Sequence, residues 1–276
     1  MTLFDAFRYD GKRAVVVGGA TGMGAAAAEL LQSAGAEVVV MDYAEVSLAG
    51  AKAIHVNLAE RDSIDAAFDQ IGGPVDALLS CAGVADGTPG IEKINFIGHR
   101  HLIDRLFADD LLPRGSAIGF ISSAAGLGWE SNLPRIKEYL ATPDFDSAAE
   151  WIAVNGGADY LSTKQAVCAY VACQAYPFMK RGVRINAICP GPTDTPLAQA
   201  NAEMWLGFGA DYRGEIGVEA STPMEQAYTL VYLCSDAAQA ISGQTLITDM
   251  GYFAAGVTEA FPPATDVANF LLGRLG

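Results

Sequence analysis

The sequence has few basic residues and no long hydrophobic run. Its 276 residues include 17 Lys and Arg against 32 Asp and Glu, a formal net charge of −15 at pH 7. A chain this acidic is poorly suited to nucleic acid or to an anionic membrane, so we expect neither as a partner. No apolar stretch reaches the roughly 18 residues of a membrane span, and residues 1–12 lack the apolar core of a secretory signal. These absences predict a cytoplasmic protein.

Cysteine and histidine are also scarce. The five cysteines are Cys81, Cys168, Cys173, Cys189 and Cys234. Their number is odd, no pair has CxxC spacing and most lie in apolar stretches, which favours reduced, buried thiols over a disulfide framework. The three histidines form no HExxH motif and no paired Cys/His spacing, so we predict no metal site.

Short apolar strands alternate with helical segments through the whole chain. Strands are predicted at 13–18, 37–41, 53–58, 75–81, 116–122, 183–189 and 244–249. Helices are predicted at 25–34, 60–71, 91–112, 158–180 and 223–234. This alternation predicts a single α/β domain over residues 1–276, built on a doubly wound, mainly parallel sheet.

A glycine-rich turn joins the first strand to the first helix. Gly18 permits a tight turn, and Gly22 and Gly24 let another backbone come close. The helix that follows offers unpaired N–H groups to a pyrophosphate, and Asp42, at the end of the second strand, can accept hydrogen bonds from ribose hydroxyls. The alternative is a loop that is merely rich in glycine. In this strand–helix–strand setting we predict a dinucleotide site.

The same segment predicts which dinucleotide binds. A 2′-phosphate would be repelled by Asp42 and would need a nearby cation. Residues 37–51 and the glycine turn contain no Lys or Arg. The charges therefore favour NAD over NADP.

Tyr160 and Lys164 stand four residues apart in a predicted helix, so their side chains share one face. An ammonium near a phenol favours the phenolate and lowers the tyrosine pKa, which suits proton transfer. Such a pair also occurs by chance in many helices. Asn95, within an otherwise apolar helix, needs hydrogen-bond partners. It can bond the backbone, or it can hold a water near an active site.

Further candidates follow the other strands. Asn57 can reach an adenine edge, although a turn-forming role is an equal alternative. Ala82 and Gly83 are small enough for a ligand to come close, and Ser123 lies just past the carboxyl end of the fifth strand. Ligands bind at that edge of open parallel sheets.

Together these motifs resemble the classical short-chain dehydrogenase/reductase family over nearly the whole chain. The pieces that match are Gly18-x-x-x-Gly22-x-Gly24, Asp42, Cys81-Ala82-Gly83, Asn95, Ser123, Tyr160-x-x-x-Lys164 and Pro190-Gly191. The resemblance implies a Rossmann-type sheet of seven parallel strands that binds NAD(H) or NADP(H).

The resemblance also implies a role for each catalytic candidate. Tyr160 would be the acid/base, Lys164 would lower its pKa and hold the nicotinamide ribose, and Ser123 would orient the substrate oxygen. Asn95 would support a water-linked proton path to Lys164. Cofactor contacts are implied for Gly18, Thr21, Gly22, Met23, Gly24, Asp42, Asn57, Leu58, Cys81, Ala82, Gly83, Tyr160, Lys164, Pro190, Gly191, Thr193 and Thr195, the two threonines at the carboxamide.

The chain departs from the family pattern in four places, one of which is Asn57 where the family frequently has an aspartate. Val17 replaces a frequent threonine, and Ser80-Cys81 replaces an Asn-Asn pair before Ala82-Gly83. Between Ser123 and Tyr160 the chain carries a long insertion, about 127–157, with helical patterns at 133–140 and 147–154. Together with Cys81-Ala82-Gly83 and the PGxTxTPL pattern of residues 190–197, this insertion resembles the branch that includes bacterial 3α-hydroxysteroid dehydrogenase/carbonyl reductase and coniferyl-alcohol dehydrogenases. We expect a homodimer or homotetramer whose interface the insertion alters.

Residues 197–221 are rich in aromatic and apolar side chains, which indicates either a substrate lid or a packing loop; we favour the lid. The aromatic residues of this segment, together with Trp129 and Trp151 of the insertion, suggest a large apolar substrate. We expect Ser123, Tyr160 and Trp205 to contact it. A hydroxysteroid fits, as do aryl or terpene alcohols. Reduction of quinones or xenobiotic carbonyls, and NAD binding without turnover, are the other hypotheses.

Overall fold

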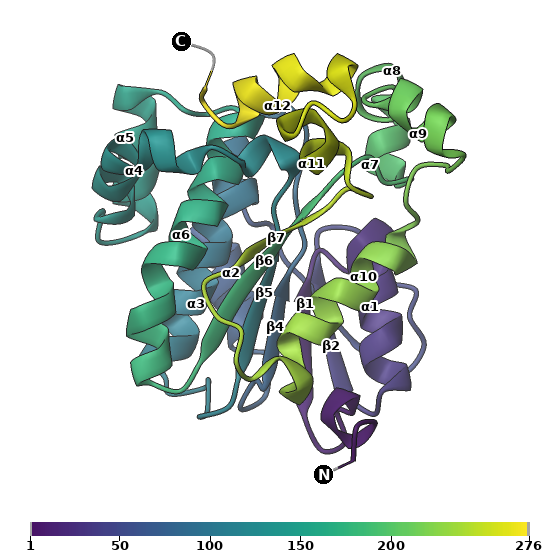
Figure 1. Cartoon of the computed structure of the whole chain (residues 1–276). Helices are drawn as coiled ribbons and strands as arrows, with labels where there is room; N and C mark the ends of the chain where they lie inside the picture. Colours follow the sequence, from purple (N-terminus) through teal and green to yellow (C-terminus); the bar gives the residue numbers. More distant parts are fainter. Residues whose placement is uncertain (1, 275–276) are drawn as a thin grey trace.

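The computed structural model describes residues 2–274, and one sheet of seven parallel strands forms its centre (Figure 1). The strand order is β3-β2-β1-β4-β5-β6-β7. The strands are β1 (Arg13–Val17), β2 (Glu37–Asp42), β3 (Lys52–His55), β4 (Ala77–Ser80), β5 (Ala117–Ile121), β6 (Arg184–Pro190) and β7 (Thr245–Thr248). The predicted Rossmann-type sheet is confirmed, and its order reverses direction between β1 and β4.

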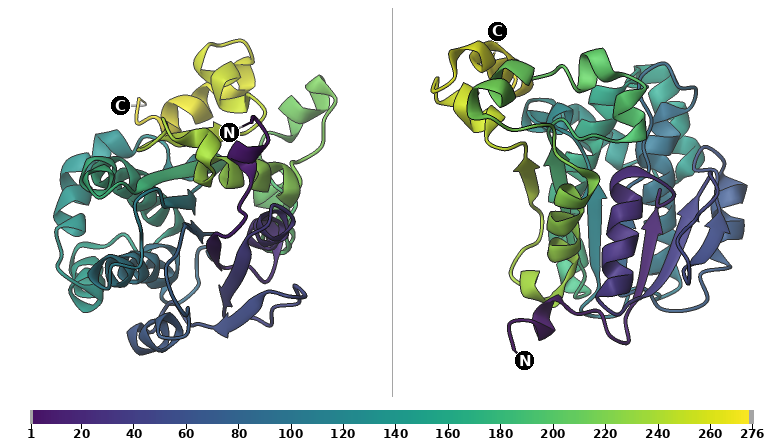
Figure 2. Two further views of the ribbon diagram at one scale, coloured as in Figure 1. Left: turned by 90° about the horizontal axis from the view of Figure 1, so that it is seen from below. Right: turned by 90° about the vertical axis from the view of Figure 1, so that its right-hand side faces the viewer.

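Long helices cover both faces of the sheet (Figures 1 and 2). One face packs against α1 (Gly22–Ser33) and α10 (Pro223–Cys234), the other against α2 (Arg61–Phe68), α3 (Gly98–Ala108) and α6 (Tyr160–Lys180). Strand β1 shows how the sequence builds both cores. Val15 and Val17 enter the core beside α3 and α6, while Ala14 and Val16 enter the core beside α1 and α10, because neighbouring side chains of a strand point to opposite faces.

Helices near the sites differ from the predicted ranges. The segment predicted as one helix over 91–112 is a π-helical turn (Lys93–Ile97) that continues into α3 and ends at Ala108. Helix α6 begins at Tyr160 rather than 158, because Asp159 caps it by accepting a hydrogen bond from the Ser162 N–H at 2.7 Å. Short 3₁₀ turns complete the chain at Asp5–Phe7, Ala124–Gly126, Trp129–Asn132, Asp236–Ala238 and Pro262–Ala264.

The insertion forms the predicted helical hairpin, α4 (Leu133–Leu140) and α5 (Phe145–Asn155). It packs on α6, on the π-helical turn before α3, and on the start of α3 itself, where Arg100 donates to the Thr142 hydroxyl at 2.9 Å. The Tyr139 ring lies 5.5 Å from the Phe96 ring, and the Asn132 amide donates to Gln165 of α6 at 2.8 Å. The hairpin therefore covers surface on these two helices that would otherwise be exposed.

Five short helices gather beyond the carboxyl ends of the strands, at the top of Figure 1. They are α7 (Pro196–Gln199), α8 (Ala202–Trp205), α9 (Ala210–Ile216), α11 (Tyr252–Val257) and α12 (Thr265–Leu271). The segment predicted as a lid is thus helical, and C-terminal helices lie beside it. Over residues 2–274, no helix is long and apolar enough to cross a membrane. All five cysteines are free, but only Cys168, Cys189 and Cys234 are buried; Cys81 and Cys173 are partly exposed.

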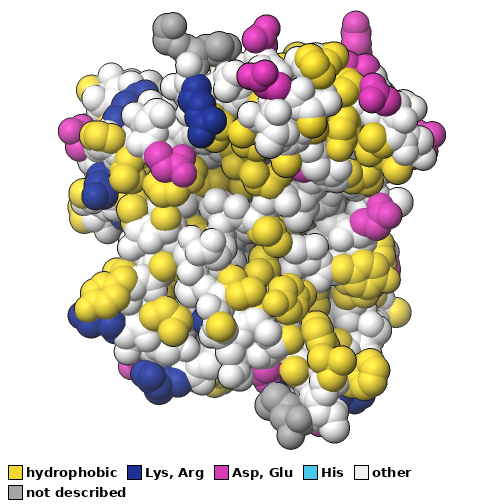
Figure 3. Space-filling model, in the orientation of Figure 1, with side chains coloured by type: hydrophobic (Ala, Val, Ile, Leu, Met, Phe, Trp, Pro, Cys, Tyr) yellow, Lys and Arg dark blue, Asp and Glu magenta, His cyan; other side chains and the backbone are white. Residues whose placement is uncertain are grey.

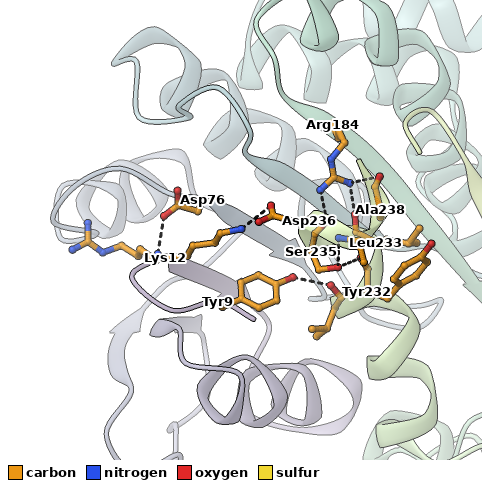
Figure 4. Close-up of polar contacts among 12 residues, drawn as sticks. Tyr9, Lys12, Asp76, Arg184, Tyr232, Leu233, Ser235, Asp236 and Ala238 are labelled. Atoms are coloured by element: carbon orange, nitrogen blue, oxygen red, sulfur yellow. Dashed lines mark hydrogen bonds and ion pairs between the residues drawn. The ribbon is translucent and has the colours of Figure 1, made fainter. Parts of the chain in front are cut away.

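A buried arginine ties β6 to the end of α10 (Figure 4). Arg184 is 4% exposed, and its guanidinium donates to the carbonyl oxygens of Leu233, Ser235 and Ala238 at 2.6, 2.8 and 3.1 Å. These carbonyls stand where helical hydrogen bonding stops, at the negative end of the helix dipole. A cation there satisfies acceptors that would otherwise be buried without donors.

We therefore expect Arg184→Leu to lower the free energy of unfolding by about 3 kcal/mol, since three buried acceptors lose their donor. Arg181→Leu, which removes an exposed ion pair with Asp110, is the control and should cost about 1 kcal/mol or less. Urea denaturation followed by fluorescence and circular dichroism measures both. Coincident transitions are expected if the chain is one domain, and equal losses in the two variants would contradict the role of Arg184.

Candidate active site

The glycine turn packs so closely against its surroundings that side chains would not fit. Gly18 has a φ of +83°, and a Cβ there would lie 2.3 Å from the backbone nitrogen of Ala82. A Cβ on Gly24 would lie 1.9 Å from the carbonyl oxygen of Gly18. Thr21 precedes α1 without capping it through its side chain, so the first N–H groups of the helix keep their capacity to bind an anion.

Asp42 ends β2 beside this turn. Its carboxylate accepts hydrogen bonds from the N–H groups of Ala20 and Ala44, each at 2.8 Å. A carboxylate has about four lone-pair sites, so two remain for a ligand. Asn57 forms a turn: its side-chain oxygen accepts from the Ala59 N–H at 3.0 Å, and its amide donates to Glu60 at 2.9 Å. The turn-forming alternative for Asn57 is therefore present in the structure.

Asn95 lies in the π-helical turn, behind the turn that follows β4. Its amide exchanges two hydrogen bonds with the backbone of Val84, at 2.8 and 3.1 Å, and donates to Thr163 of α6 at 3.2 Å. The buried asparagine thus has the backbone partners that the sequence required.

Two cavities meet at this edge of the sheet. The first, of about 440 Å³, contains no Lys or Arg among its lining residues within 2–274. The predicted cofactor residues that line it are Gly18, Thr21, Gly22, Met23, Gly24, Asp42, Asn57, Leu58, Cys81, Ala82, Gly83 and Thr195. The second, of about 300 Å³, is lined by the remaining five, Tyr160, Lys164, Pro190, Gly191 and Thr193, and by Ser123. Met23, Cys81, Gly83, Thr195 and Leu197 line both.

Tyr160 and Lys164 lie on one face of α6, as their spacing predicts. The Lys164 nitrogen is 5.5 Å from the centre of the Tyr160 ring and donates to the carbonyl oxygen of Ile121 at 3.0 Å. The lysine is 4% exposed. Burial lowers its pKa to about 8, because the charged form loses hydration.

The pKa of Tyr160 is raised, whereas the neighbouring lysine was expected to lower it. Burial raises it above the ordinary value of a phenol, and the hydrogen bond with Ser123 lowers it only in part. The Lys164 ammonium is turned toward Ile121 and does not offset the loss of hydration. At neutral pH the phenol is therefore protonated.

The remaining candidates come from loops at strand ends. Ser123 follows β5, and its hydroxyl accepts from the Ala125 N–H at 3.2 Å. After β6, the Thr193 hydroxyl donates to the Gly191 carbonyl at 3.0 Å, while Thr195 caps α7 by accepting from the Ala198 N–H. The structure brings all of them to the second cavity.

An aromatic contact forms part of the wall of the second cavity. The Trp205 ring of α8 lies 5.1 Å from the Tyr160 ring, and Met204 and Phe208 line the cavity beside it. Within residues 2–274, Lys164 is the only charged residue of the lining.

The expectation that the insertion tryptophans help to form an apolar substrate site is wrong. Trp151 stacks on Tyr139 at 5.2 Å, and Trp129 packs in a separate cluster with Leu127 and Phe253, because both rings fill space between the insertion and the body. Neither lines the two cavities.

Two further residues of the site carry no recognisable signal in the sequence. Asp86 accepts a hydrogen bond from the Tyr160 N–H at 2.6 Å and so joins the loop after β4 to the start of α6. Leu271 reaches the second cavity from α12. Neither belongs to a motif, and only the folded chain brings them to the site.

A doubly wound sheet with a glycine turn at its point of reversal defines a Rossmann-type α/β protein. Family models described as "short chain dehydrogenase" and "Enoyl-(Acyl carrier protein) reductase" match residues 12–130 and 144–253. The cis-4-hydroxycyclohexanecarboxylate dehydrogenase of Sinomonas cyclohexanicum is 31% identical over 259 residues, 87% of this chain and 96% of that protein. The chain belongs to the short-chain dehydrogenase family of oxidoreductases.

Two further similarities agree with this assignment. The coniferyl-alcohol dehydrogenase of Pseudomonas sp. (strain HR199 / DSM 7063) is 28% identical over 250 residues, which cover 87% of this chain and 96% of the relative. A crystal structure of the 3-alpha-hydroxysteroid dehydrogenase from Pseudomonas sp. B-0831, complexed with NADH, is 28% identical with a TM-score of 0.71, covering 91% of this chain and 99% of the other.

The buried ammonium of Lys164 should reduce stability at neutral pH. We expect Lys164→Met to raise the free energy of unfolding at pH 7 by about 1–2 kcal/mol, after allowance for the hydrogen bond lost at Ile121. Between pH 8 and 10.5 the unfolded chain holds more protons than the folded one, so the wild type gains stability as pH rises and the difference shrinks. Urea denaturation at pH 7 and pH 10 measures this. Exposed Lys180→Met is the control, and a destabilised Lys164→Met protein would contradict the argument.

Proposed function

We propose that the protein is an NAD-dependent oxidoreductase that interconverts an apolar secondary alcohol and its ketone, with a hydroxysteroid as substrate. The observation that carries the proposal is the position of Ser123, Tyr160 and Lys164 in one cavity that adjoins the glycine-turn cavity. A cofactor in the first cavity and an alcohol in the second would meet at their shared lining.

The roles follow from the contacts. The Ser123 hydroxyl donates a hydrogen bond to the substrate oxygen, and the Tyr160 phenol gives that oxygen a proton during ketone reduction or removes one during alcohol oxidation. Lys164 places a cation 5.5 Å from the centre of the Tyr160 ring, and Asn95 and Asp86 hold the surrounding backbone. The dinucleotide, when bound, supplies or accepts the hydride.

The first cavity fits a dinucleotide. The glycine turn excludes side chains, the uncapped start of α1 suits a pyrophosphate, and Asp42 keeps free lone pairs for ribose hydroxyls. The lack of Lys and Arg in the described lining supports NAD, because a 2′-phosphate would meet only the Asp42 charge.

The lining of the second cavity supports an uncharged, apolar substrate. Trp205, Met204, Phe208 and Leu271 supply apolar contacts, and no arginine stands ready in the described lining to pair with a carboxylate. A relative acts on a hydroxysteroid, as its name states, and another on coniferyl alcohol. An aryl or terpene alcohol is therefore the second candidate, and carbonyl or quinone reduction would use the same residues.

Absorbance at 340 nm tests the proposal directly. Purified protein with NAD is expected to form NADH with a 3-hydroxysteroid and to turn over NADP at least about tenfold less efficiently. Because burial raises the pKa of Tyr160, oxidation should become faster as pH rises and ketone reduction slower. Aryl, terpene and carboxylated alcohols complete the panel.

The variant Tyr160→Phe tests the role of Tyr160, because it removes the hydroxyl and keeps the ring. Turnover should fall by about 10³-fold or more while NADH binding, measured by fluorescence, stays within about twofold. Retained turnover would refute the role of Tyr160. Tight NADH binding by the wild type without turnover of any substrate would favour the non-catalytic hypothesis.

We also propose a homodimer or homotetramer whose interface differs from one built on α3 and α6, because the insertion packs on those helices. Figure 3 shows hydrophobic side chains gathered over α10. Tyr228 of α10 is 59% exposed, and Leu246 of the edge strand β7 is 45% exposed. This face supports self-association.

Light scattering after size exclusion measures the assembly. Tyr228→Asp combined with Leu246→Asp should lower the molecular mass of the particle, because charges would be buried in the interface. The control is Val154→Asp, at an exposed position of α5 in the insertion, which should leave the mass unchanged. The reverse result would place the interface on the insertion.

A further inference from the structure

The turn Ala82-Gly83-Val84 forms one wall of the first cavity, and the glycine turn forms another. The position of the 82–84 turn therefore affects the space between these two walls. The Ala82 N–H donates to the Val17 carbonyl at 2.9 Å. No Cβ would fit between Gly18 and Ala82, so the two backbones are in direct contact. A small movement of Ala82 would therefore change the cavity that a dinucleotide must enter.

Two side chains from the beginning of the α3 segment hold this turn from behind. Asn95 binds both backbone groups of Val84. His99, four residues further on, places its Nε2 atom 3.1 Å from the carbonyl oxygen of Ala82. Gly98, between them, lies so close to Leu58 that a Cβ would be 2.6 Å from its carbonyl oxygen. The start of this helix thus touches two loops that line the cavity.

His99 has an environment that packing alone does not explain. It is 1% exposed, its ring lies edge-on to Phe120 at 5.9 Å, and its Nδ1 atom has no hydrogen-bond partner in the part of the chain that the structure describes. Leucine or phenylalanine would fill such a site without an unpaired polar atom. Among residues 2–274, the ring forms its one hydrogen bond with Ala82.

The protonation of His99 follows from its surroundings. Burial is the main cause that lowers its pKa to about 4; the hydrogen bond to Ala82 opposes this shift and the nearby Lys164 ammonium adds to it, so the ring is neutral at pH 7. A neutral imidazole carries one N–H, and a carbonyl oxygen only accepts hydrogen bonds. The proton must therefore lie on Nε2, and the bare lone pair lies on Nδ1.

We propose that His99 is a positioning residue for dinucleotide binding: its Nε2–H group fixes the Ala82 carbonyl and so holds the 82–84 turn in the shape that accepts the cofactor. This role rests on the proposed function, since it assigns the first cavity to a dinucleotide. His99 acts through the backbone and touches no reacting atom.

Titration of the protein with NADH and NADPH, followed by fluorescence, tests the proposal without any alcohol. We expect His99→Leu to weaken NADH binding about tenfold, because the carbonyl loses its buried donor. His99→Gln, which restores an N–H near the Nε2 position, should recover affinity to within about threefold of the wild type. His101→Leu, on the same helix but facing Asp65, is the control and should leave binding unchanged.

Steady-state kinetics give a second readout that a purely structural role would not produce. The KM for NAD should rise in His99→Leu while the kcat and the KM for the alcohol stay within about twofold. A variant with lower thermal stability but unchanged dinucleotide affinity would overturn the proposal. So would a His99→Gln protein that binds NADH no better than His99→Leu.

The tautomer of His99 is a third measurement, and it needs no variant. The chain has three histidines, so ¹⁵N-histidine labelling gives few signals. We expect one neutral ring protonated on Nε2 whose resonance shifts when NADH is added. A proton on Nδ1 would overturn the proposal, because Nε2 could not then donate to Ala82. Wild-type protein that binds neither NADH nor NADPH would overturn the dinucleotide assignment and this inference with it.

Discussion

The contact between two backbones at the centre of the sheet is the constraint on which the rest of the site depends. Gly18 and Ala82 follow neighbouring strands, β1 and β4, and approach too closely for a side chain on Gly18. This contact occurs where the strand order reverses, so the loops diverge on either side and leave a cleft between them. Helix α1 can then begin directly at that cleft, because Gly24 lets its first turn lie against the Gly18 carbonyl.

Helix α6, on the face of the sheet opposite α1, carries the groups proposed to act in the reaction, and the burial of one of them lowers stability. Lys164 is buried on α6, where it donates a hydrogen bond to the backbone carbonyl of Ile121, and burial raises the pKa of the Tyr160 phenol. Contacts along α6 offset this cost. Asp159 caps α6, Asp86 binds its first N–H, and the insertion packs along it. Stability from packing thus offsets the burial of a charge that the proposed reaction uses.

The second cavity is assembled from segments that are far apart in the sequence. Trp205 comes from the α7–α9 segment, Leu271 from α12 near the end of the chain, and Ser123 from the loop after β5. The α12 helix also packs against the insertion: a Cβ on Gly128 would lie 2.0 Å from the Leu271 carbonyl oxygen. The shape of the apolar cavity therefore depends on the insertion indirectly, through α12, although its tryptophans lie elsewhere.

The sequence by itself determined which candidate groups follow which strand. The glycine turn, Asp42, Asn95, Ser123 and the Tyr160–Lys164 pair could be found because their proposed roles depend on residue type and local spacing. Apolar strands and helix periodicity likewise predicted the sheet and the insertion helices. Only the tertiary structure decided which side chains contact one another between different helices, strands and loops. It turned Lys164 toward Ile121, paired His99 with Ala82, and brought Asp86 and Leu271 to the site. These contacts join residues distant in sequence, and no local pattern encodes a contact whose partner is set by the packing of the whole chain.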